Sequence, residues 1–211
     1  MDSKTLSREA PKDRLEEFRR GIARHFAMPV VSVIGRTGIS PNAVTWLGFF
    51  VTLVAATLAG SGYLLAAGIV SLLAAFCDTL DGALARKLNR VTRFGGVLDS
   101  TLDRLAEGAM LTGILVWYVN NSNERPVIPA LLVAITIVAS FTVSYIRARA
   151  EGAGIKCEVG ISTRPERVIL TSLGLLINQV TIALAIIAVM SSVTVIQRLY
   201  HVWMETNKSN A

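Results

Sequence analysis

Long apolar runs alternate with short polar connections through most of this chain, and they predict a succession of membrane-length helices. Six such runs follow one another from about residue 40. All approach the ~20 residues that a helix needs to cross a bilayer except the fifth, which is shorter. The predicted segments are 42–60, 63–88, 95–119, 126–150, 165–177 and 179–203. We therefore expect an all-α integral membrane protein with six transmembrane helices.

A different pattern precedes these runs. Apolar residues recur at spacings of three and four, with arginines between them: Leu15, Phe18, Ile22 and Phe26. This spacing predicts an amphipathic helix that lies in the headgroup layer or packs on the protein's own surface, and the two are compatible. We accordingly divide the chain into residues 1–39, a polar tail with this juxtamembrane helix, and residues 40–211, the six-helix domain.

The boundary between these two parts is marked by residues that disfavour helix. Pro29, Gly35 and Gly38 interrupt the amphipathic pattern. Ser40 is then suited to cap the first apolar helix, and Pro41 suits the first helical position. The least distinct boundary is the one between the fifth and sixth segments.

The composition agrees with a membrane protein, since 52% of the residues are hydrophobic and only 17% are charged. The net charge of +6 falls in short clusters between apolar runs, which suits anionic lipid headgroups and argues against nucleic acid as a partner. The clusters occupy alternate connections: Arg20, Arg24 and Arg36; Arg86, Lys87, Arg90 and Arg93; Arg147, Arg149, Lys156 and Arg164; and Arg198 and Lys208. By the positive-inside rule, both termini and these loops are predicted to be cytoplasmic in a multi-pass plasma-membrane protein.

Four aspartates stand between the second and third apolar runs. Asp78 and Asp81 are three residues apart, and Asp99 and Asp103 are four apart, so each pair shares one helical face. An antiparallel hairpin brings both faces into one small space. Hard oxygen ligands without histidine or thiolate favour Mg²⁺, Mn²⁺ or Ca²⁺ over zinc. Alternatively, the acids form ion pairs that only hold the hairpin together, with Arg86, Arg93 and Arg104.

The residues around the aspartates suit a diphosphate substrate. Two divalent ions would balance four carboxylates and clamp a diphosphate during an in-line displacement. Gly82, Gly95 and Gly96 leave space for a substrate beside the acids. Arg86, five residues after Asp81, is placed to contact a phosphate oxygen.

The complete spacing resembles the signature of the CDP-alcohol phosphotransferase family: Asp78-x2-Asp81-Gly82-x2-Ala85-Arg86-x8-Gly95-x3-Asp99-x3-Asp103. The resemblance covers the chain from about Ser40 onward. It implies a six-helix bundle, commonly a homodimer, in which a nucleotide-activated lipid meets an alcohol and CMP departs.

The resemblance also implies roles for individual residues. Asp78, Asp81 and Asp99 are expected to bind the metal ions. Asp103 is expected to touch one ion and to accept the proton of the acceptor hydroxyl, since a carboxylate freer of metal keeps more proton affinity. The positions matched to the CDP-lipid are Pro41, Asn42, Ala43, Val44, Gly82, Ala85, Arg86, Thr92 and Gly95. For the threonine and the first four of these, an ordinary role at a helix start is the open alternative.

Arginines gather on both sides of the connection between the fourth and fifth segments: Arg147, Arg149, Arg164 and Arg167. Guanidinium groups suit bidentate capture of a phosphate dianion, although positive-inside loops also accumulate arginine. These segments resemble the subgroup that makes phosphatidylinositol phosphate from CDP-diacylglycerol and inositol phosphate, with a related branch that uses archaeal lipids. In that subgroup, the four arginines and Ser144 fall where the acceptor phosphate is expected. Lysine is common there at the position of Arg147.

The sequence thus predicts an enzyme that transfers the phosphatidyl group of CDP-diacylglycerol, or an archaeal-type CDP-lipid, to inositol 1-phosphate, with two Mg²⁺ ions or with Mn²⁺. The main alternative is the same chemistry with glycerol 3-phosphate or another polar alcohol such as serine. Glycerol-phosphate enzymes of the family usually carry proline and lysine where Ser100 and Arg104 stand, which counts against this alternative. A divalent-cation transporter that uses the aspartates as an ion path leaves the arginine cluster unexplained.

Overall fold

The computed structural model describes residues 28–36, 38–121 and 127–209, which are helical apart from short connections. Its six labelled helices are α2 (Pro41–Gly60), α3 (Leu64–Lys87), α4 (Arg93–Asn121), α5 (Val127–Gly152), α6 (Arg164–Leu176) and α7 (Val180–Ser209). Each end lies within two residues of its predicted position except the last, because α7 continues to Ser209 rather than ending at residue 203. The all-α fold class is therefore confirmed.

The predicted amphipathic helix lies outside the described residues. A helical segment, residues 28–34, is described before α2. Pro29 lies within this segment, and its φ suits a helix; the residues whose pattern it was predicted to interrupt lie outside the described part of the chain. Val31 of the segment is fully buried and packs in a cluster with Leu80 and Leu84 of α3. The segment is thereby attached to the end of α3 that carries the first two aspartates.

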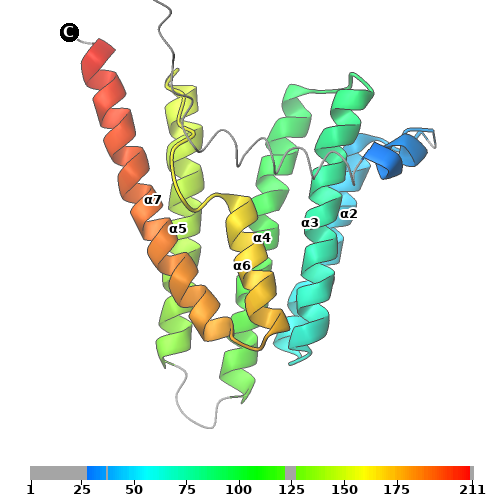
Figure 1. Cartoon of the computed structure of the whole chain (residues 1–211), viewed down its shortest axis with the longest axis vertical. Coiled ribbons are helices and arrows are strands. Elements are labelled where there is room, and N and C mark those ends of the chain that lie inside the picture. Colours follow the sequence, from blue (N-terminus) through cyan, green and yellow to red (C-terminus); the bar gives the residue numbers. More distant parts are fainter. Residues whose placement is uncertain (1–27, 37, 122–126, 210–211) are drawn as a thin grey trace, which may run out of the picture.

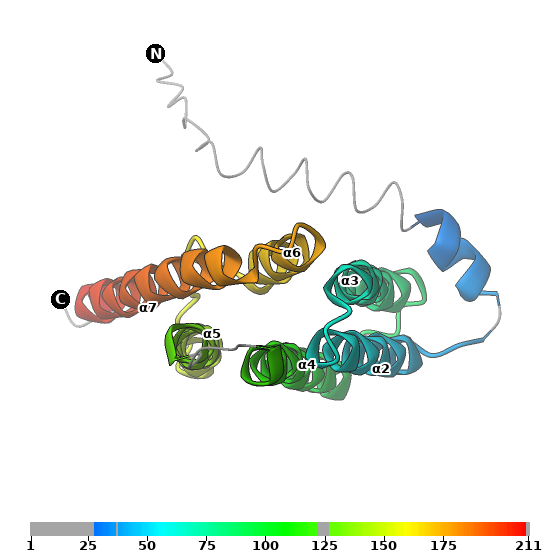
Figure 2. The ribbon, with the colours of Figure 1, turned by 90° about the horizontal axis from the view of Figure 1, so that it is seen from below.

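The helices pack as two rows of three. Seen along the bundle, α7, α6 and α3 form one row, and α5, α4 and α2 form the other (Figure 2). Helix α2 packs against α3 and α4, α5 against α7, and α6 against α3 and α7. Helices α4 and α6 are not among the closely packed pairs, and side chains of both line a pocket between them.

Capping explains where several helices begin and end. The hydroxyl of Ser40 accepts a hydrogen bond from the backbone N–H of Ala43 at 3.3 Å, and Pro41 starts α2, as predicted. Helices α3 and α6 are followed by asparagines with left-handed backbone, Asn89 (φ 51°) and Asn178 (φ 55°), a conformation that asparagine tolerates well. The turn at Asn178 therefore accounts for the least distinct of the predicted boundaries.

Glycines allow α2 to approach its two neighbours closely. A Cβ atom on Gly113 of α4 would overlap the carbonyl group of Ala56 in α2. A Cβ atom on Gly48 of α2 would lie 2.8 Å from Oδ1 of Asp78 in α3. Since neither place has room for a larger side chain, these glycines set the spacing of α2, α3 and α4.

Apolar and charged residues are segregated along the bundle. The main apolar cluster lies where α2 ends, α3 starts and α6 turns into α7, toward the bottom of Figure 1; it includes Leu64, Leu111, Ile114, Leu175 and Leu184. The opposite end holds the last turns of α3 and the first turns of α4 (Figure 1). The four aspartates lie in these turns.

Helix α6 is short because the connection before it enters the bundle. Residues 153–163 descend beside α5 before the chain turns into α6 (Figure 1). The first residue of α6, Arg164, therefore lies part-way along the bundle rather than at its end (Figure 1). The connection thus carries a charged helix terminus to the depth of the aspartates.

Within the described ranges, four helices are long and apolar enough to cross a membrane: α2, α3, α5 and α7. Helices α4 and α6 do not meet these criteria of length and hydropathy. Helix α4 carries charged residues in its first four turns, and α6 has 13 residues, roughly 20 Å at 1.5 Å per residue. The structure thus agrees with a membrane protein and identifies four candidate spans.

Candidate active site

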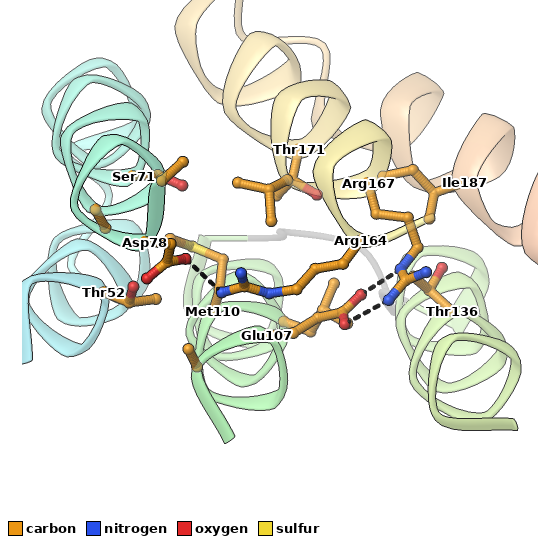
Figure 3. A pocket seen from close by; sticks show the side chains of 15 residues that line it. Thr52, Ser71, Asp78, Glu107, Met110, Thr136, Arg164, Arg167, Thr171 and Ile187 are labelled. Carbon is orange, nitrogen blue, oxygen red and sulfur yellow. Dashed lines mark hydrogen bonds and ion pairs between the residues drawn. The ribbon is translucent and has the colours of Figure 1, made fainter. Parts of the chain in front are cut away.

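Arg164 joins aspartates from two helices. Its Nη2 lies 2.7 Å from Oδ2 of Asp78 on α3, and its Nη1 lies 2.9 Å from Oδ1 of Asp103 on α4. Figure 3 shows the guanidinium reaching from α6 toward Asp78. All three side chains are less than a third exposed. The hairpin thus brings the two aspartate pairs together, as predicted, with an arginine from the fifth predicted segment between them.

The remaining two aspartates lie beside this bridge. Asp81 is 5% exposed, and one of its carboxylate oxygens accepts a hydrogen bond from the backbone N–H of Gly82. Within the described part of the chain, its other oxygen, Oδ2, has no hydrogen-bond partner of good geometry, although the side chain of Thr45 lies close enough to act on the carboxyl group. Asp99 is half-buried one turn before Asp103. A buried carboxylate oxygen without a donor is costly, and a bound cation would satisfy it.

The four carboxylates are of the type that binds a hard divalent cation, although they are not arranged around a common point. Among the described residues, no three acidic, histidine or cysteine side chains lie close enough to share an ion. The unpartnered oxygen of Asp81 and the all-carboxylate donor set nevertheless fit Mg²⁺ or Mn²⁺. Arg164 already holds one oxygen each of Asp78 and Asp103, so those oxygens are directed to the arginine.

The neighbouring arginines do not form the ion pairs considered as an alternative from the sequence. Arg104 donates to the backbone carbonyl of Ser100. The guanidinium of Arg86 lies over Gly82, where an added Cβ would be 3.4 Å from Nη1. The contacts found with the aspartates of the described chain are those of Arg164 instead.

A second ion pair lies one turn deeper between α4 and α6. Nε and Nη2 of Arg167 donate to the two carboxylate oxygens of Glu107 at 2.6 and 2.8 Å. Nη1 donates to the carbonyl of Ser162 at 3.1 Å. The side chains of Arg167 and Glu107 are 2% and 9% exposed, and Figure 3 shows them facing each other. The four side chains form a two-rung ladder, with Asp103–Arg164 above Glu107–Arg167.

Glu107 is a site residue that the sequence analysis missed. It lies four residues after Asp103, so it shares a helical face with that aspartate. The same spacing argument that paired Asp99 with Asp103 would have found it. The ladder also places Arg167 in a buried ion pair, whereas the sequence analysis expected its guanidinium to face an acceptor phosphate.

A small cavity lies beside the ladder, in the interior of the bundle. It contains about 30 Å³ of space, enough for about one water molecule. Polar side chains from several helices line it along with Arg164 and Arg167: Thr52, Ser71, Asp78, Glu107, Thr136 and Thr171. Most of these are labelled in Figure 3, where they surround the two arginines.

Three residues predicted to bind the CDP-lipid converge at the starts of α2 and α4. A Cβ atom on Gly95 would lie 2.9 Å from Oγ1 of Thr92 and 3.2 Å from Oδ1 of Asn42. The hydroxyl of Thr92 accepts a hydrogen bond from the N–H of Gly95 at 2.9 Å, which caps α4. Thr92 therefore has the helix-start role that the sequence analysis left open, and it has that role beside the proposed nucleotide region.

The other predicted CDP-lipid residues are arranged around this point. Ala43 and Arg86 are exposed, and Pro41, Gly82 and Ala85 are partly buried. The side chain of Val44 is only 4% exposed and belongs to the apolar cluster of α3 and the preceding segment. Its side chain therefore packs the helices together.

The predicted acceptor residues on α5 lie at the end of that helix. Arg147 is exposed and pairs with Glu151 at 2.8 Å. Arg149 is also exposed, and Ser144 is partly buried one turn before Arg147. The four predicted arginines thus do not form one cluster: two point into the ladder, and two lie at the surface of α5.

Arg198 has a place that the sequence analysis did not foresee. It was grouped with basic residues after the last span, but it lies inside α7 and is 3% exposed. Its Nε donates to the carbonyl of Val159 at 2.9 Å, and its Nη1 to the carbonyl of Val143 at 2.5 Å. The charges of Arg147 and Arg167 both act on it. Arg198 therefore links α7 to α5 and to the connection before α6 through their backbone carbonyls.

Cys157 lies in the connection beside Arg198. It is a free cysteine with no exposed surface. Burial raises the pKa of its thiol, against the opposing charges of Arg198 and Arg147. The thiol therefore remains protonated and fills space, as expected for a packing residue.

Several known proteins are similar to this chain in sequence and in fold. A family model described as CDP-alcohol phosphatidyltransferase matches residues 38–202. The chain is 40% identical over 177 residues to archaetidylinositol phosphate synthase of Pyrococcus horikoshii, covering 79% of this chain and 87% of that protein. The crystal structure of Mycobacterium tuberculosis phosphatidylinositol phosphate synthase with CDP-DAG bound is similar at a TM-score of 0.77 and 33% identity, covering 85% of this chain and 94% of that one.

The same mycobacterial enzyme in complex with manganese and citrate gives a TM-score of 0.76 and 35% identity, covering 83% of this chain and 88% of that one. Both structures therefore share the helical arrangement described above. The family model spans all six helices except the last residues of α7. The chain therefore belongs to the CDP-alcohol phosphatidyltransferase family.

Proposed function

We propose that this protein is a membrane-bound phosphatidylinositol phosphate synthase, which transfers the phosphatidyl group of CDP-diacylglycerol to inositol 1-phosphate and releases CMP. Membership of the family makes the chain an enzyme of this reaction type. The observation that carries the proposal is the contact of Arg164 of α6 with one aspartate from each pair, Asp78 on α3 and Asp103 on α4. The relatives named as phosphatidylinositol and archaetidylinositol phosphate synthases support this acceptor.

The aspartates are the residues proposed to hold divalent ions, either two Mg²⁺ or Mn²⁺. The set comprises Asp78, Asp81, Asp99 and Asp103. The unpartnered oxygen of Asp81 supports this role, as does the manganese complex of the mycobacterial enzyme. Bound ions supply positive charge that offsets the charge of a diphosphate during displacement.

Asp103 is proposed as the general base. It accepts the proton of an inositol hydroxyl while that oxygen bonds to the lipid-side phosphorus, and the bond from this phosphorus to the oxygen of CMP breaks. Only one carboxylate oxygen of Asp103, Oδ1, contacts Arg164. The other oxygen is therefore available to accept a proton, which supports this role. The displacement is direct and requires no protein nucleophile.

The CDP group is proposed to lie over the starts of α2 and α4 and the last turns of α3. The proximity of Asn42, Thr92 and Gly95 supports one continuous surface there. Arg86 is exposed beside Gly82, where its guanidinium is suited to a phosphate oxygen. The residues proposed to complete this surface are Pro41, Ala43, Val44 and Ala85.

The acceptor phosphate is proposed to lie between the aspartates and the arginines of α5 and α6. Its candidate ligands remain Ser144, Arg147, Arg149, Arg164 and Arg167. Guanidinium groups bind a phosphate dianion through paired hydrogen bonds. Arg147 and Arg149 are exposed at the end of α5, where a soluble acceptor can reach them.

We further propose that six helices cross the plasma membrane, that the aspartate end and both termini are cytoplasmic, and that the enzyme is a homodimer. The basic residues near the ends of α3 and α5 lie at the aspartate end (Figure 1), which agrees with the positive-inside rule. Helix α7 also finishes at that end (Figure 1). A site at this level admits a lipid laterally and a soluble acceptor from water.

A panel of acceptors tests the proposed function. Purified protein in detergent, with Mg²⁺ and CDP-diacylglycerol, is expected to release CMP with inositol phosphate. Release with free inositol or serine is expected to be at least about a hundredfold slower, because a site built for a phosphate leaves its polar groups unpaired without one. Glycerol 3-phosphate carries the phosphate but lacks the inositol ring, and release with it is also expected to be slower than with inositol phosphate. CMP release is followed by chromatography.

Release with glycerol 3-phosphate alone would keep the enzyme class and overturn the acceptor. Release that requires none of the acceptors would indicate hydrolysis of the CDP-lipid rather than transfer. Flux of Mn²⁺ into vesicles without CMP release would favour the transporter alternative.

A further inference from the structure

Arg164 occupies an unusual position for a side chain expected to bind a phosphate. Its guanidinium donates to carboxylates of two different helices, at 2.7 and 2.9 Å. Its third nitrogen group, Nε, is buried and has no hydrogen-bond partner in the described chain. The side chain is therefore held in place by the two aspartates, and its own hydrogen-bonding capacity is incompletely used.

The guanidinium and a metal ion require the same atoms. Asp78 Oδ2 and Asp103 Oδ1 each face a nitrogen of Arg164. An ion bound between the helices needs oxygen ligands at about 2.0 to 2.6 Å, and an oxygen directed at a guanidinium is not free to take that position. Binding of the ion and of Arg164 at these two oxygens is therefore competitive.

The lower rung of the ladder shows that α6 need not move for Arg164 to leave. Arg167 is anchored by both oxygens of Glu107 and by the carbonyl of Ser162. Arg164 is the first residue of α6, one turn before that anchor. Its long side chain can rotate away while Arg167 holds the helix in place.

We propose that Arg164 is an internal counter-cation, which neutralises Asp78 and Asp103 before a divalent ion loads and is released toward the acceptor phosphate when the ion binds. The inference rests on the proposed function in taking the aspartates as metal ligands and Arg164 as a ligand of the acceptor phosphate. It makes the two sites reciprocal: an anion that binds Arg164 favours metal binding, and metal binding favours the anion.

Metal binding without substrates tests this inference. Full-length protein in detergent is titrated with Mn²⁺ by calorimetry, as wild type, as Arg164→Gln and as Arg104→Gln. Arg104→Gln is the matched control, since it removes a guanidinium whose charge also acts on Asp99 and Asp103 but which donates to Ser100 instead. Arg164→Gln is expected to bind Mn²⁺ about tenfold more tightly than wild type, because two charge-assisted hydrogen bonds no longer compete.

The control is expected to show a smaller gain from the lost charge alone. An affinity of Arg164→Gln equal to or weaker than that of Arg104→Gln, in protein with the wild-type circular dichroism spectrum, would overturn the inference. Asp81→Asn separates this result from failure of the proposed function. Wild-type binding that is undetectable or insensitive to Asp81→Asn would contradict the metal site itself.

A second measurement applies if Arg164→Gln does not fold. Wild-type protein is titrated with Mn²⁺ in sodium sulfate and in sodium chloride at equal ionic strength, with free Mn²⁺ corrected for sulfate complexes. Sulfate is expected to bind Arg164 and to raise the Mn²⁺ affinity about fivefold. An unchanged or lower affinity in sulfate would overturn the inference.

Discussion

Replacing Asp103 with asparagine is expected to lower the rate of CMP release about a hundredfold to ten-thousandfold, the usual contribution of a general base. The amide keeps the size of the side chain and an oxygen that can accept from Arg164, which lies 2.9 Å from Oδ1 in the wild type. It cannot accept the proton of the acceptor hydroxyl. Because Asp103 is also a proposed metal ligand, the assay is run at saturating Mg²⁺, where the loss is expected in kcat, with little change in the KM for CDP-diacylglycerol.

Glu158→Gln is the control for this experiment. It also turns a carboxylate into an amide near the same end of the bundle, but Glu158 is exposed and pairs with Lys156 at 3.3 Å. It is expected to retain close to full activity. If Asp103→Asn also retained more than half of the wild-type rate, Asp103 would not be the base.

Breaking the buried ion pair of Glu107 and Arg167 is expected to destabilise the protein strongly. The two side chains are 9% and 2% exposed, so Glu107→Leu leaves a buried guanidinium whose main partner is gone. Such an uncompensated charge costs about 3 to 5 kcal/mol. In a chain of this size that corresponds to a fall in the thermal unfolding midpoint of about 10 °C or more.

The double variant Glu107→Leu with Arg167→Met shows whether Glu107→Leu destabilises the protein by leaving the charge of Arg167 without a partner or by disturbing the packing of the side chains. Replacing both partners with apolar side chains removes the uncompensated charge, and such replacements are often neutral in stability. The midpoint of the double variant is therefore expected to return most of the way to that of the wild type, measured in the same detergent. A double variant as unstable as Glu107→Leu would show that packing, rather than charge, is what these side chains provide.

The helices and the aspartate site could be predicted because their signals are local. Apolar runs of membrane length mark each helix, and the spacing of Asp78 and Asp81, or of Asp99 and Asp103, directs each pair to one face. The turn between α6 and α7 depends on the left-handed backbone of Asn178. An asparagine predicts such a turn only weakly, so this helix boundary was the least distinct in the sequence.

The arginines could not be assigned in the same way, because their partners are distant in sequence. The depth of Arg164 depends on the course of residues 153–163 into the bundle, which a polar segment does not reveal. Arg198 lies within an apolar run, where its hydrogen bonds to two backbone carbonyls depend on how α7 packs against α5 and the connection. Charge patterning predicted the basic residues at the ends of α3 and α5, which lie at one end of the bundle, but the pairing of each cation depends on tertiary structure.

The most direct test of the central claim is a competition between two acceptors for one enzyme. Inositol 1-phosphate and glycerol 3-phosphate are supplied in equal concentration with CDP-diacylglycerol and Mg²⁺, and the lipid products are identified by mass. Their ratio equals the ratio of the two kcat/KM values. The account predicts that phosphatidylinositol phosphate forms almost alone; a mixture dominated by phosphatidylglycerol phosphate would contradict it.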